Sequence, residues 1–201
     1  LSGEVRPDAG RVRCAGRDIT TMSVPARSAL GLARSFQITS IFPDFTALDN
    51  VALAVQAHAG HSFRFWRPAA RDQGLRRPAM AILTNIGLGA RADEPAANLS
   101  HGEQRQLEIA MALATGPSLL LLDEPASGLS VEETTDMRWW IDDIRRQMGI
   151  TVLMVEHDMG LVSNVADRVL ALADGAKLSE GTPAHVQSDP AVIKAYLGGA
   201  A

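Results

Sequence analysis

The chain has 201 residues, of which 46% are apolar and 21% charged, proportions that are ordinary for a globular protein. Its formal net charge of -4 supplies no overall positive field, so we expect no nucleic-acid partner. A single cysteine, Cys14, excludes a disulfide within the chain and indicates a reducing compartment. No apolar run reaches the roughly 18–20 residues that span a bilayer, so any membrane role would require a partner.

Short elements separated by turns are expected in the first half of the chain. Thr46 and Asp49 resemble a helix start, in which a threonine caps the first turn and an acid follows three residues on. Residues 60–78 are irregular and basic, with aromatic residues interleaved. The expected elements are a strand within residues 10–16 and helices at residues 25–33, from residue 46 onward and at residues 78–87.

The second half alternates strands and helices more regularly. Serines followed three residues later by a glutamate form capping boxes and predict helices that begin at Ser100 and Ser130. Residues 119–122 and 151–155 are apolar runs typical of strands buried on both faces, and residues 169–173 predict a third strand. Further helices are expected at residues 159–166 and from Pro190. Strand–helix–strand order indicates a parallel sheet with helices packed on it.

Two adjacent carboxylates, Asp123 and Glu124, follow the first of these buried strands. In an open α/β sheet, ligands bind at the carboxyl ends of the strands. An aspartate there can hold Mg²⁺ through water, and the next glutamate can orient or deprotonate an attacking water. The alternative is a polar turn without chemistry, and the motif alone favours neither reading.

Other polar residues at element ends suit the same ligand. Ser100, Gly102 and the free N–H groups of the first helical turn form a natural anion site, although this segment by itself favours a capping box with no further function. His157 follows the strand at residues 151–155 and could reach the same phosphate, but a lone histidine is more often structural or solvated. Gln37 could offer a metal ligand and a water contact, and by itself indicates nothing.

The order and spacing of these motifs resemble the ABC ATPase family over essentially the whole chain. The matching positions are Gln37 for the Q-loop glutamine, residues 99–104 for the signature motif, residues 119–123 for the Walker B strand, Glu124 for the catalytic glutamate, residues 127–130 for the D-loop and His157 for the switch histidine. Three residues depart from the family pattern: His101, Glu103 and Ser130 stand where glycine, glutamine and aspartate are usual.

Further stretches are similar to the ATPases of branched-chain amino-acid importers. They are Ala33-Arg34-Ser35-Phe36-Gln37, Leu48-Asp49-Asn50-Val51, Arg105-Gln106-Leu107-Glu108-Ile109-Ala110 and Val155-Glu156-His157-Asp158-Met159. Urea and short-amide importers are close relatives, so the solute is less certain than the family.

The resemblance implies an α/β fold: the parallel-sheet P-loop NTPase core of ABC type, with a helical subdomain at about residues 46–115 and a small antiparallel β region. The 201 residues contain no Gly-x-x-x-x-Gly-Lys-Ser/Thr phosphate loop, because the only lysines are Lys177 and Lys194. We therefore expect one incomplete domain, residues 1–201, whose first strand and phosphate-loop helix lie upstream of Leu1. Alone, this chain should bind ATP poorly and not hydrolyse it.

The resemblance also implies a mechanism with ATP and Mg²⁺ as cofactors. Two ATPase subunits would pair head to tail, so that the signature residues 100–103 and the D-loop Ser130 act on the partner's nucleotide. Asp123 and Gln37 would hold Mg²⁺ in cis, Glu124 would polarise the attacking water, and His157 would clamp the γ-phosphate.

The implied partners are a second ATPase subunit, transmembrane permease subunits and, indirectly, a solute-binding protein, with the chain peripheral at the cytoplasmic face of the inner membrane. Phe42, Phe45 and residues 60–78 are candidates for the permease contact, although a variable, solvated loop with a few packed aromatics is the slightly favoured interpretation of residues 60–78. The alternatives are a non-catalytic partner subunit that supplies only the signature face, and a soluble ABC ATPase. The second of these carries coiled-coil insertions or a duplicated cassette, which this sequence lacks.

Overall fold

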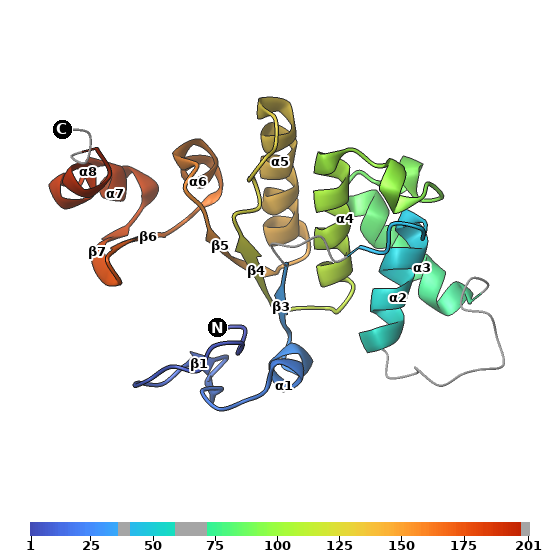
Figure 1. The fold of residues 1–201 in the computed structure, drawn as a ribbon, viewed down its shortest axis with the longest axis horizontal. Helices are drawn as coiled ribbons and strands as arrows, with labels where there is room; N and C mark the ends of the chain where they lie inside the picture. The colour runs from blue at the N-terminus through green and yellow to red at the C-terminus, as the bar shows by residue number, and fades with distance from the viewer. Residues whose placement is uncertain (36–40, 59–71, 198–201) are drawn as a thin grey trace.

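A computed structural model describes residues 1–35, 41–58 and 72–197 (Figure 1). Its strands are β1 (Arg13–Cys14), β2 (Arg17–Asp18), β3 (Leu32–Arg34), β4 (Leu119–Asp123), β5 (Thr151–Val155), β6 (Val169–Ala173) and β7 (Ala176–Gly181). Its α-helices are α1 (Val24–Ala29), α2 (Ala47–His58), α3 (Gln73–Asn85), α4 (His101–Leu113), α5 (Val131–Gln147), α6 (Met159–Val165), α7 (Pro183–Ser188) and α8 (Pro190–Leu197). The short 3-10 turns η2 (Gly89–Arg91) and η3 (Ala96–Asn98) connect α3 to α4.

A parallel sheet with the strand order β3-β4-β5 forms the centre of the molecule. The apolar run of β4 lies between its neighbours, where Leu120 and Leu122 are fully buried, as its sequence predicts. Register pairs Asp123 with Val155, so β4 and β5 end side by side. The residues that follow these two strands are thereby brought to the same edge of the sheet.

Helices α2, α3 and α4 pack together at one end of the molecule (Figure 1). Their buried faces join the sheet in one core, to which α5 contributes Met137, Ile141 and Ile144. This arrangement supports the expected subdomain at residues 46–115, whose boundaries remain a prediction. Helix α4 lies between these helices and β4, and so connects them to the sheet edge.

Two antiparallel hairpins complete the described chain: β1 pairs with β2, and β6 with β7. Both turn through two residues at positive φ, Ala15-Gly16 and Asp174-Gly175. Such turns match the right-handed twist of the flanking strands, which is why glycine is favoured there. Hairpin β6–β7, with α7 and α8, forms the end of the molecule opposite α2 and α3 (Figure 1).

Four expectations about elements were wrong. The helix expected at residues 25–33 ends at Ala29, because Gly31 adopts φ 89° and the chain then enters β3. Helix α3 begins at Gln73 rather than Pro78, because Asp72 caps it by accepting from the N–H of Gly74. Strand β5 is exposed on one face and only partly buried on the other, and β6 pairs antiparallel with β7 rather than joining the parallel sheet.

Candidate functional site

The turn after β4 holds Glu124 in an unusual backbone conformation. Glu124 adopts φ 45°, a value that residues other than glycine rarely adopt. Its N–H donates to the carbonyl of Val155 at 2.9 Å. A non-glycine residue in this region costs about 1–3 kcal/mol and persists only where its surroundings impose it. The contact with Val155 is one such restraint, and it ties the turn to the end of β5.

Asp123 shares its carboxylate with an arginine from β3. Arg34 Nη2 lies 3.0 Å from Asp123 Oδ2, and the same guanidinium pairs with Glu4. Burial lowers the pKa of Arg34, but the bonds with Asp123 and Glu4 outweigh it, so the pKa is raised. The carboxylate of Asp123 offers oxygen ligands, which Mg²⁺ as a hard cation prefers. One of its two oxygens is already paired with Arg34.

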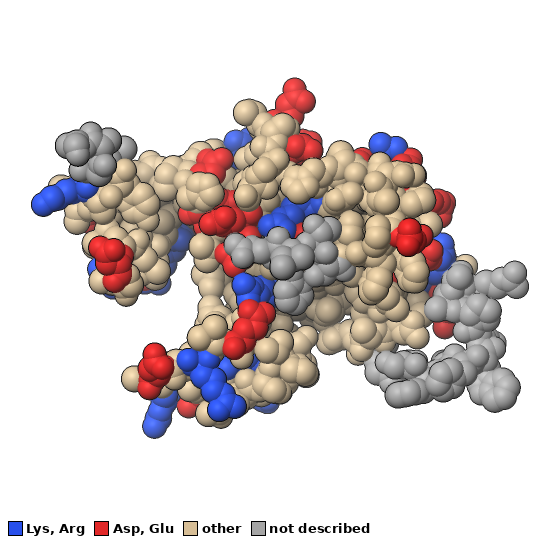
Figure 2. All heavy atoms as spheres, in the orientation of Figure 1, with Lys and Arg blue, Asp and Glu red and all other residues tan. Residues whose placement is uncertain are grey.

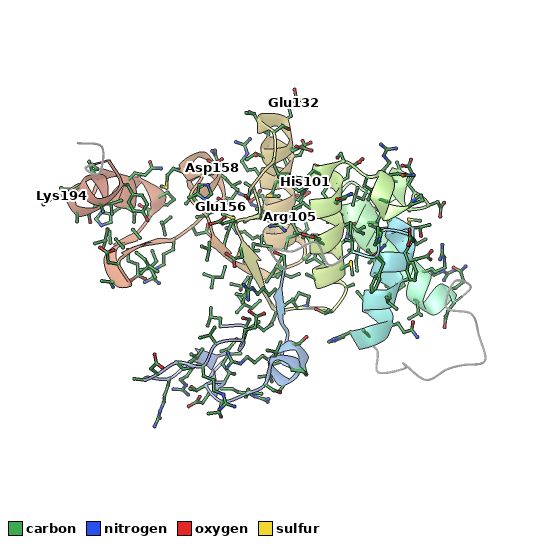
Figure 3. The ribbon with its side chains drawn as sticks, viewed as in Figure 1. His101, Arg105, Glu132, Glu156, Asp158 and Lys194 are labelled. Carbon is green, nitrogen blue, oxygen red and sulfur yellow. The ribbon has the colours of Figure 1, made fainter. Side chains whose placement is uncertain are left out.

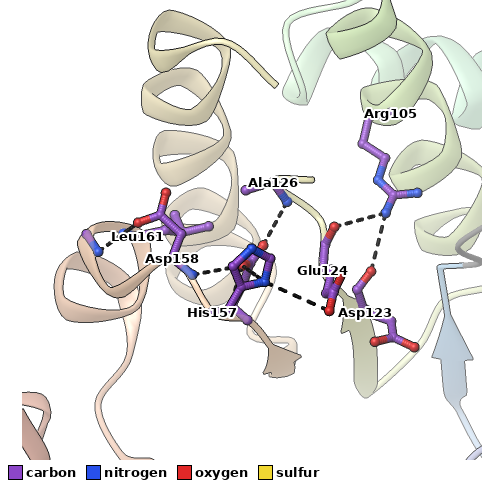
Figure 4. A network of polar contacts seen from close by, with 9 residues as sticks. Arg105, Asp123, Glu124, Ala126, His157, Asp158 and Leu161 are labelled. Carbon is purple, nitrogen blue, oxygen red and sulfur yellow. Dashed lines mark hydrogen bonds and ion pairs between the residues drawn. The ribbon is translucent and has the colours of Figure 1, made fainter. Parts of the chain in front are cut away.

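His157 lies beside Glu124, as the parallel strand ends predict. Its Nδ1 is 3.8 Å from Glu124 Oε1, and both side chains are exposed, His157 by 73% and Glu124 by 42% (Figure 4). The structure thus brings together two residues that are 33 positions apart in the sequence. Both face solvent at the sheet edge, where a ligand can reach them.

Glu156 is a site residue that the sequence analysis did not single out. Its side chain is 1% exposed, and its carboxylate accepts hydrogen bonds from the backbone N–H groups of Ala126, His157 and Asp158. Acidic side chains gather at the centre of the face shown in Figure 2, over the ends of β4 and β5. Its position next to the predicted histidine was the only signal in the sequence.

The sequence also showed no sign of the contacts made by Arg105 on α4, although Arg105 begins one of the stretches similar to the importer ATPases. Its guanidinium donates to the carbonyl oxygens of Asp123 and Glu124 at 3.3 Å and of Pro125 at 3.4 Å. It also forms a buried ion pair with Glu108 at 2.7 Å. The signature helix is thereby bonded to the backbone of the turn that carries the carboxylates, and Figure 3 shows Arg105 and His101 on this helix.

A cavity of about 360 Å³ opens between α4 and the turn after β4. Its lining is predominantly polar or charged and comprises His101, Gln104, Arg105, Glu108, Glu124, Ser127 and Gly128. Two of the predicted residues, His101 and Glu124, therefore face a common space. The cavity is wide enough for water and for a phosphate-sized group to approach Glu124.

The signature segment forms the predicted capping box. Ser100 Oγ accepts from the N–H of Glu103, and the Glu103 carboxylate accepts from the N–H of Ser100. Partial burial raises the pKa of Glu103, but the bonds from Ser100 and Arg91 outweigh it, and the pKa is lowered. The structure therefore confirms the cap and leaves the anion-binding role a prediction.

The N–H of Gly102 has a partner within the chain. It donates to Glu133 Oε1 at 3.1 Å, and Glu133 also closes the capping box with Ser130 at the start of α5. A Cβ at Gly102 would overlap the Glu133 carboxylate, so the close approach requires glycine. The Glu133 carboxylate is thus hydrogen-bonded to one of the amides expected to bind phosphate. This contact agrees with an anion site at this helix start.

Gln37 lies outside the described residues, as do residues 60–71 of the basic stretch. The nearby Phe42 and Phe45 are exposed by 46% and 45%, with ring centroids 5.4 Å apart. In the part of the chain that is described, no helix is long and apolar enough to cross a membrane. Among the described residues, the candidate site consists of residues on β3 and α4, at the end of β4 and in the turns after β4 and β5.

Comparisons with known proteins agree with this geometry. The family model described as ABC transporter matches residues 1–127, and the model described as branched-chain amino acid ATP-binding cassette transporter matches residues 176–201. The high-affinity branched-chain amino acid transport ATP-binding protein BraF of Pseudomonas aeruginosa is 37% identical over 98% of this chain and 80% of its own length. LivG of Escherichia coli, with the same description, is 35% identical over 98% and 80%.

Solved structures lead to the same family. An ATP-binding cassette of an ABC transporter, in its ADP conformation, superposes with a TM-score of 0.83 at 27% identity over 98% of this chain and 80% of that one. A nucleotide-free cassette gives a TM-score of 0.82 at 26% identity over 97% and 79%. The fold is that of a nucleotide-binding α/β ATPase. This chain belongs to the ABC transporter family, as an ATP-binding subunit.

Proposed function

We propose that this subunit powers the import of branched-chain amino acids, with Glu124 and His157 as its catalytic side chains. The observation that carries the assignment of the site is the 3.8 Å separation of His157 Nδ1 and Glu124 Oε1 at adjoining strand ends. The solute is inferred from the printed names of BraF and LivG and from the match of residues 176–201.

The residues divide the reaction between them. Glu124 orients the attacking water and accepts its proton at a carboxylate oxygen, and His157 donates to an oxygen of the γ-phosphate. Asp123, with Gln37, would hold Mg²⁺, which supplies positive charge for the phosphate oxygens when bound. Arg34 must share or release Asp123 for that contact, because it already pairs with Oδ2. Catalysis then rests on positioning and charge stabilisation.

A second ATPase subunit completes each site. Ser100, His101, Gly102 and Glu103 at the start of α4, and Ser130 at the start of α5, would face the partner's γ-phosphate. The first-turn amides and the helix dipole favour such an anion. Glu133 would leave the amide of Gly102 as the phosphate arrives, since two anions cannot share one donor.

Phe42 and Phe45 support a contact with transmembrane permease subunits. Exposed aromatic residues that pack on each other suit a protein interface. The permease would in turn receive its solute from a solute-binding protein, and the subunit would be peripheral on the cytoplasmic face of the membrane. ATP binding and hydrolysis would reach the permease through this loop and α2, which follows it.

The catalytic assignment is tested by the Glu124→Gln variant of the assembled transporter, with an ATPase subunit that includes the phosphate loop. We expect the ATPase kcat to fall by about 100-fold or more, because the amide cannot take a proton. Glu132→Gln, an exposed acid on α5, is the matched control and should hydrolyse ATP like the wild type. Full activity of Glu124→Gln would mean that the subunit supplies only the signature face.

The solute is tested by uptake of labelled leucine into vesicles that contain the assembled transporter and its binding protein. We expect leucine uptake that depends on ATP and is inhibited by unlabelled isoleucine and valine. Uptake of urea or a short amide, without leucine uptake, would assign the transporter to that class instead.

The 201-residue chain alone should bind Mg-ATP weakly. It contains no phosphate loop, and its two lysines, Lys177 on β7 and Lys194 on α8, lie away from the ends of β4 and β5 (Figure 3 labels Lys194). A calorimetric titration with Mg-ATP should give no saturable binding in the micromolar range. Tight binding would contradict this part of the proposal.

A further inference from the structure

One buried carboxylate joins the two turns that carry the proposed catalytic side chains. Glu156 Oε1 accepts from the N–H of Ala126 at 2.8 Å, and Oε2 accepts from the N–H groups of His157 at 3.0 Å and Asp158 at 3.2 Å (Figure 4). Ala126 belongs to the turn after β4, and the other two belong to the turn after β5. Each carboxylate oxygen therefore serves a different turn.

Burial makes this contact costly to leave incomplete. The Glu156 side chain is 1% exposed, and a buried carboxylate is tolerated only where it is hydrogen-bonded or paired. The three amides that it accepts from lie outside the helices and strands of the described chain, so no backbone ladder satisfies them. Carboxylate and amides thus depend on each other.

The two turns hold Glu124 and His157. Glu124 is two residues before Ala126, and His157 directly follows Glu156. Strand pairing fixes Asp123 beside Val155, but pairing ends there. Beyond that point, the Glu124–Val155 bond and the bonds of Glu156 hold the backbone of the two turns, and the His157–Glu124 contact joins their side chains. Without Glu156, the backbone of the turn after β4 would lose the hydrogen bond from Ala126 that ties it to the turn after β5.

We infer that Glu156 is a positioning residue that fixes the distance between Glu124 and His157. The inference rests on the proposed function, because it concerns the same two side chains. Glu156 acts through the backbone of both turns rather than by contact with nucleotide. Its loss should therefore slow the chemical step and leave nucleotide affinity unchanged.

Glu156→Gln separates the two roles of the carboxylate. Glutamine has nearly the same volume, but only one of its two terminal atoms accepts hydrogen bonds. The amide oxygen can keep His157 and Asp158 or keep Ala126, and its NH₂ group then meets an N–H on the other side. One turn is released while the side chain still fills its site.

The experiment measures steady-state ATPase kinetics of the assembled transporter, with an ATPase subunit that includes the phosphate loop, for the wild type, Glu156→Gln and the exposed control Glu132→Gln. We expect kcat to fall about 10-fold or more in Glu156→Gln, with KM for ATP unchanged, and no change in the control. An unaltered kcat, or a KM that rises in proportion to the loss of activity, would overturn the inference. A wild-type transporter without ATPase activity would instead refute the proposed function.

Amide hydrogen exchange tests the hydrogen bond from Ala126 to Glu156 in the wild-type protein, without any variant. In the wild-type transporter, the Ala126 amide should exchange at least about 100-fold more slowly than an unstructured amide, as resolved by fragmentation mass spectrometry, although it lies in a turn. Exchange at the unprotected rate would overturn the inference even if Glu156→Gln fails to assemble. In an assembled Glu156→Gln variant, protection must fall at Ala126 or at both His157 and Asp158.

Discussion

At the scale of single residues, the backbone strain of the candidate site lies at Glu124, the proposed catalytic residue. Glu124 adopts φ 45°, and two hydrogen bonds hold its backbone. Its N–H donates to the carbonyl of Val155, and its carbonyl accepts from Arg105. The strain persists because the neighbouring bonds over-determine the turn. It directs the Glu124 side chain toward His157 and the cavity, which a relaxed turn would not ensure.

This strain predicts an order of stability between two inactive variants. Glu124→Gly and Glu124→Ala both lose the carboxylate, but glycine adopts positive φ without a steric cost. Glu124→Gly should therefore be more stable than Glu124→Ala by about 1 kcal/mol, despite the larger entropy of glycine in the unfolded chain. Urea denaturation of the purified proteins measures the difference. Equal stability, or a more stable alanine variant, would show that the turn is not strained.

At the scale of elements, α2 organises the loop that precedes it through one buried amide. Asn50 is fully buried, accepts from the N–H of Phe42 at 2.8 Å, and donates to the carbonyl oxygens of Phe42 and Thr46 at 3.0 Å each and of Phe45 at 3.4 Å. The side chain replaces the backbone partners that a loop lacks. It thereby holds the two exposed phenylalanines in place.

Loss of this amide should destabilise the protein and weaken its proposed permease contact. Asn50→Ala leaves one N–H and several carbonyls without their partner, at a cost of about 2–3 kcal/mol. Leu53→Ala, a partly exposed position on the same helix, is the control and should cost less than about 1 kcal/mol. Urea denaturation gives the stabilities, and co-purification with the permease gives the contact. An Asn50→Ala variant as stable as the control would refute the assigned role of Asn50.

The start of α5 depends on an ionised glutamate. The backbone N–H and hydroxyl of Ser130 lower the pKa of Glu133, and the N–H of Gly102 lowers it further. A carboxyl whose pKa is lower in the folded state stabilises the protein above the unfolded pKa, about 4.3 for glutamate. That contribution is lost as the pH falls through the folded-state pKa.

Glu133→Gln should therefore weaken the dependence of the unfolding free energy on pH. We expect the wild type to be the more stable above about pH 5, and the difference in unfolding free energy to shrink as the pH falls toward about 3. Urea denaturation of both proteins at a series of pH values measures this difference. A difference that stays constant down to pH 3 would contradict the role of the ionised carboxylate.

Elements were predictable where local signals agreed with packing. The capping boxes at Ser100 and Ser130 predicted the starts of α4 and α5, and the apolar run predicted β4. The proline at residue 78 was read as a helix start, but it lies inside α3, whose cap is Asp72. Strand β5 is apolar from Val152 to Val155, yet Leu153 and Val155 are exposed, because its burial depends on what covers the sheet and not on its own composition.

At the scale of the whole molecule, the sheet edge assembles residues from distant segments. The sequence predicted that Glu124 and His157 would meet, because parallel strands carry both to one edge. Arg105 and Glu156 were not predicted, because their contacts go to backbone atoms of other segments, which leave no pattern in a sequence. Sequence motifs name the side chains that contact a ligand, whereas the groups that hold them become visible only in the fold.

The last prediction concerns the division of each ATP site between two subunits. If Glu124 acts in cis and Gly102 in trans, then two copies form two sites, each with one contribution from each copy. A dimer that carries Glu124→Gln in one copy and Gly102→Asp in the other keeps one intact site. A dimer that carries both changes in one copy and none in the other has a defect in each site.

Such dimers can be isolated with two affinity tags and assembled with the permease. The first should retain about half of the wild-type ATPase activity if its sites act independently, and the second should retain less than about 1%, since loss of either contribution removes transition-state stabilisation. Gly102→Asp also displaces Glu133, so the stability of each variant is measured beside its activity. The reverse order, with the second dimer about half active and the first nearly inactive, would show that Gly102 and Glu124 belong to the same site of one subunit, and the head-to-tail arrangement would then be wrong.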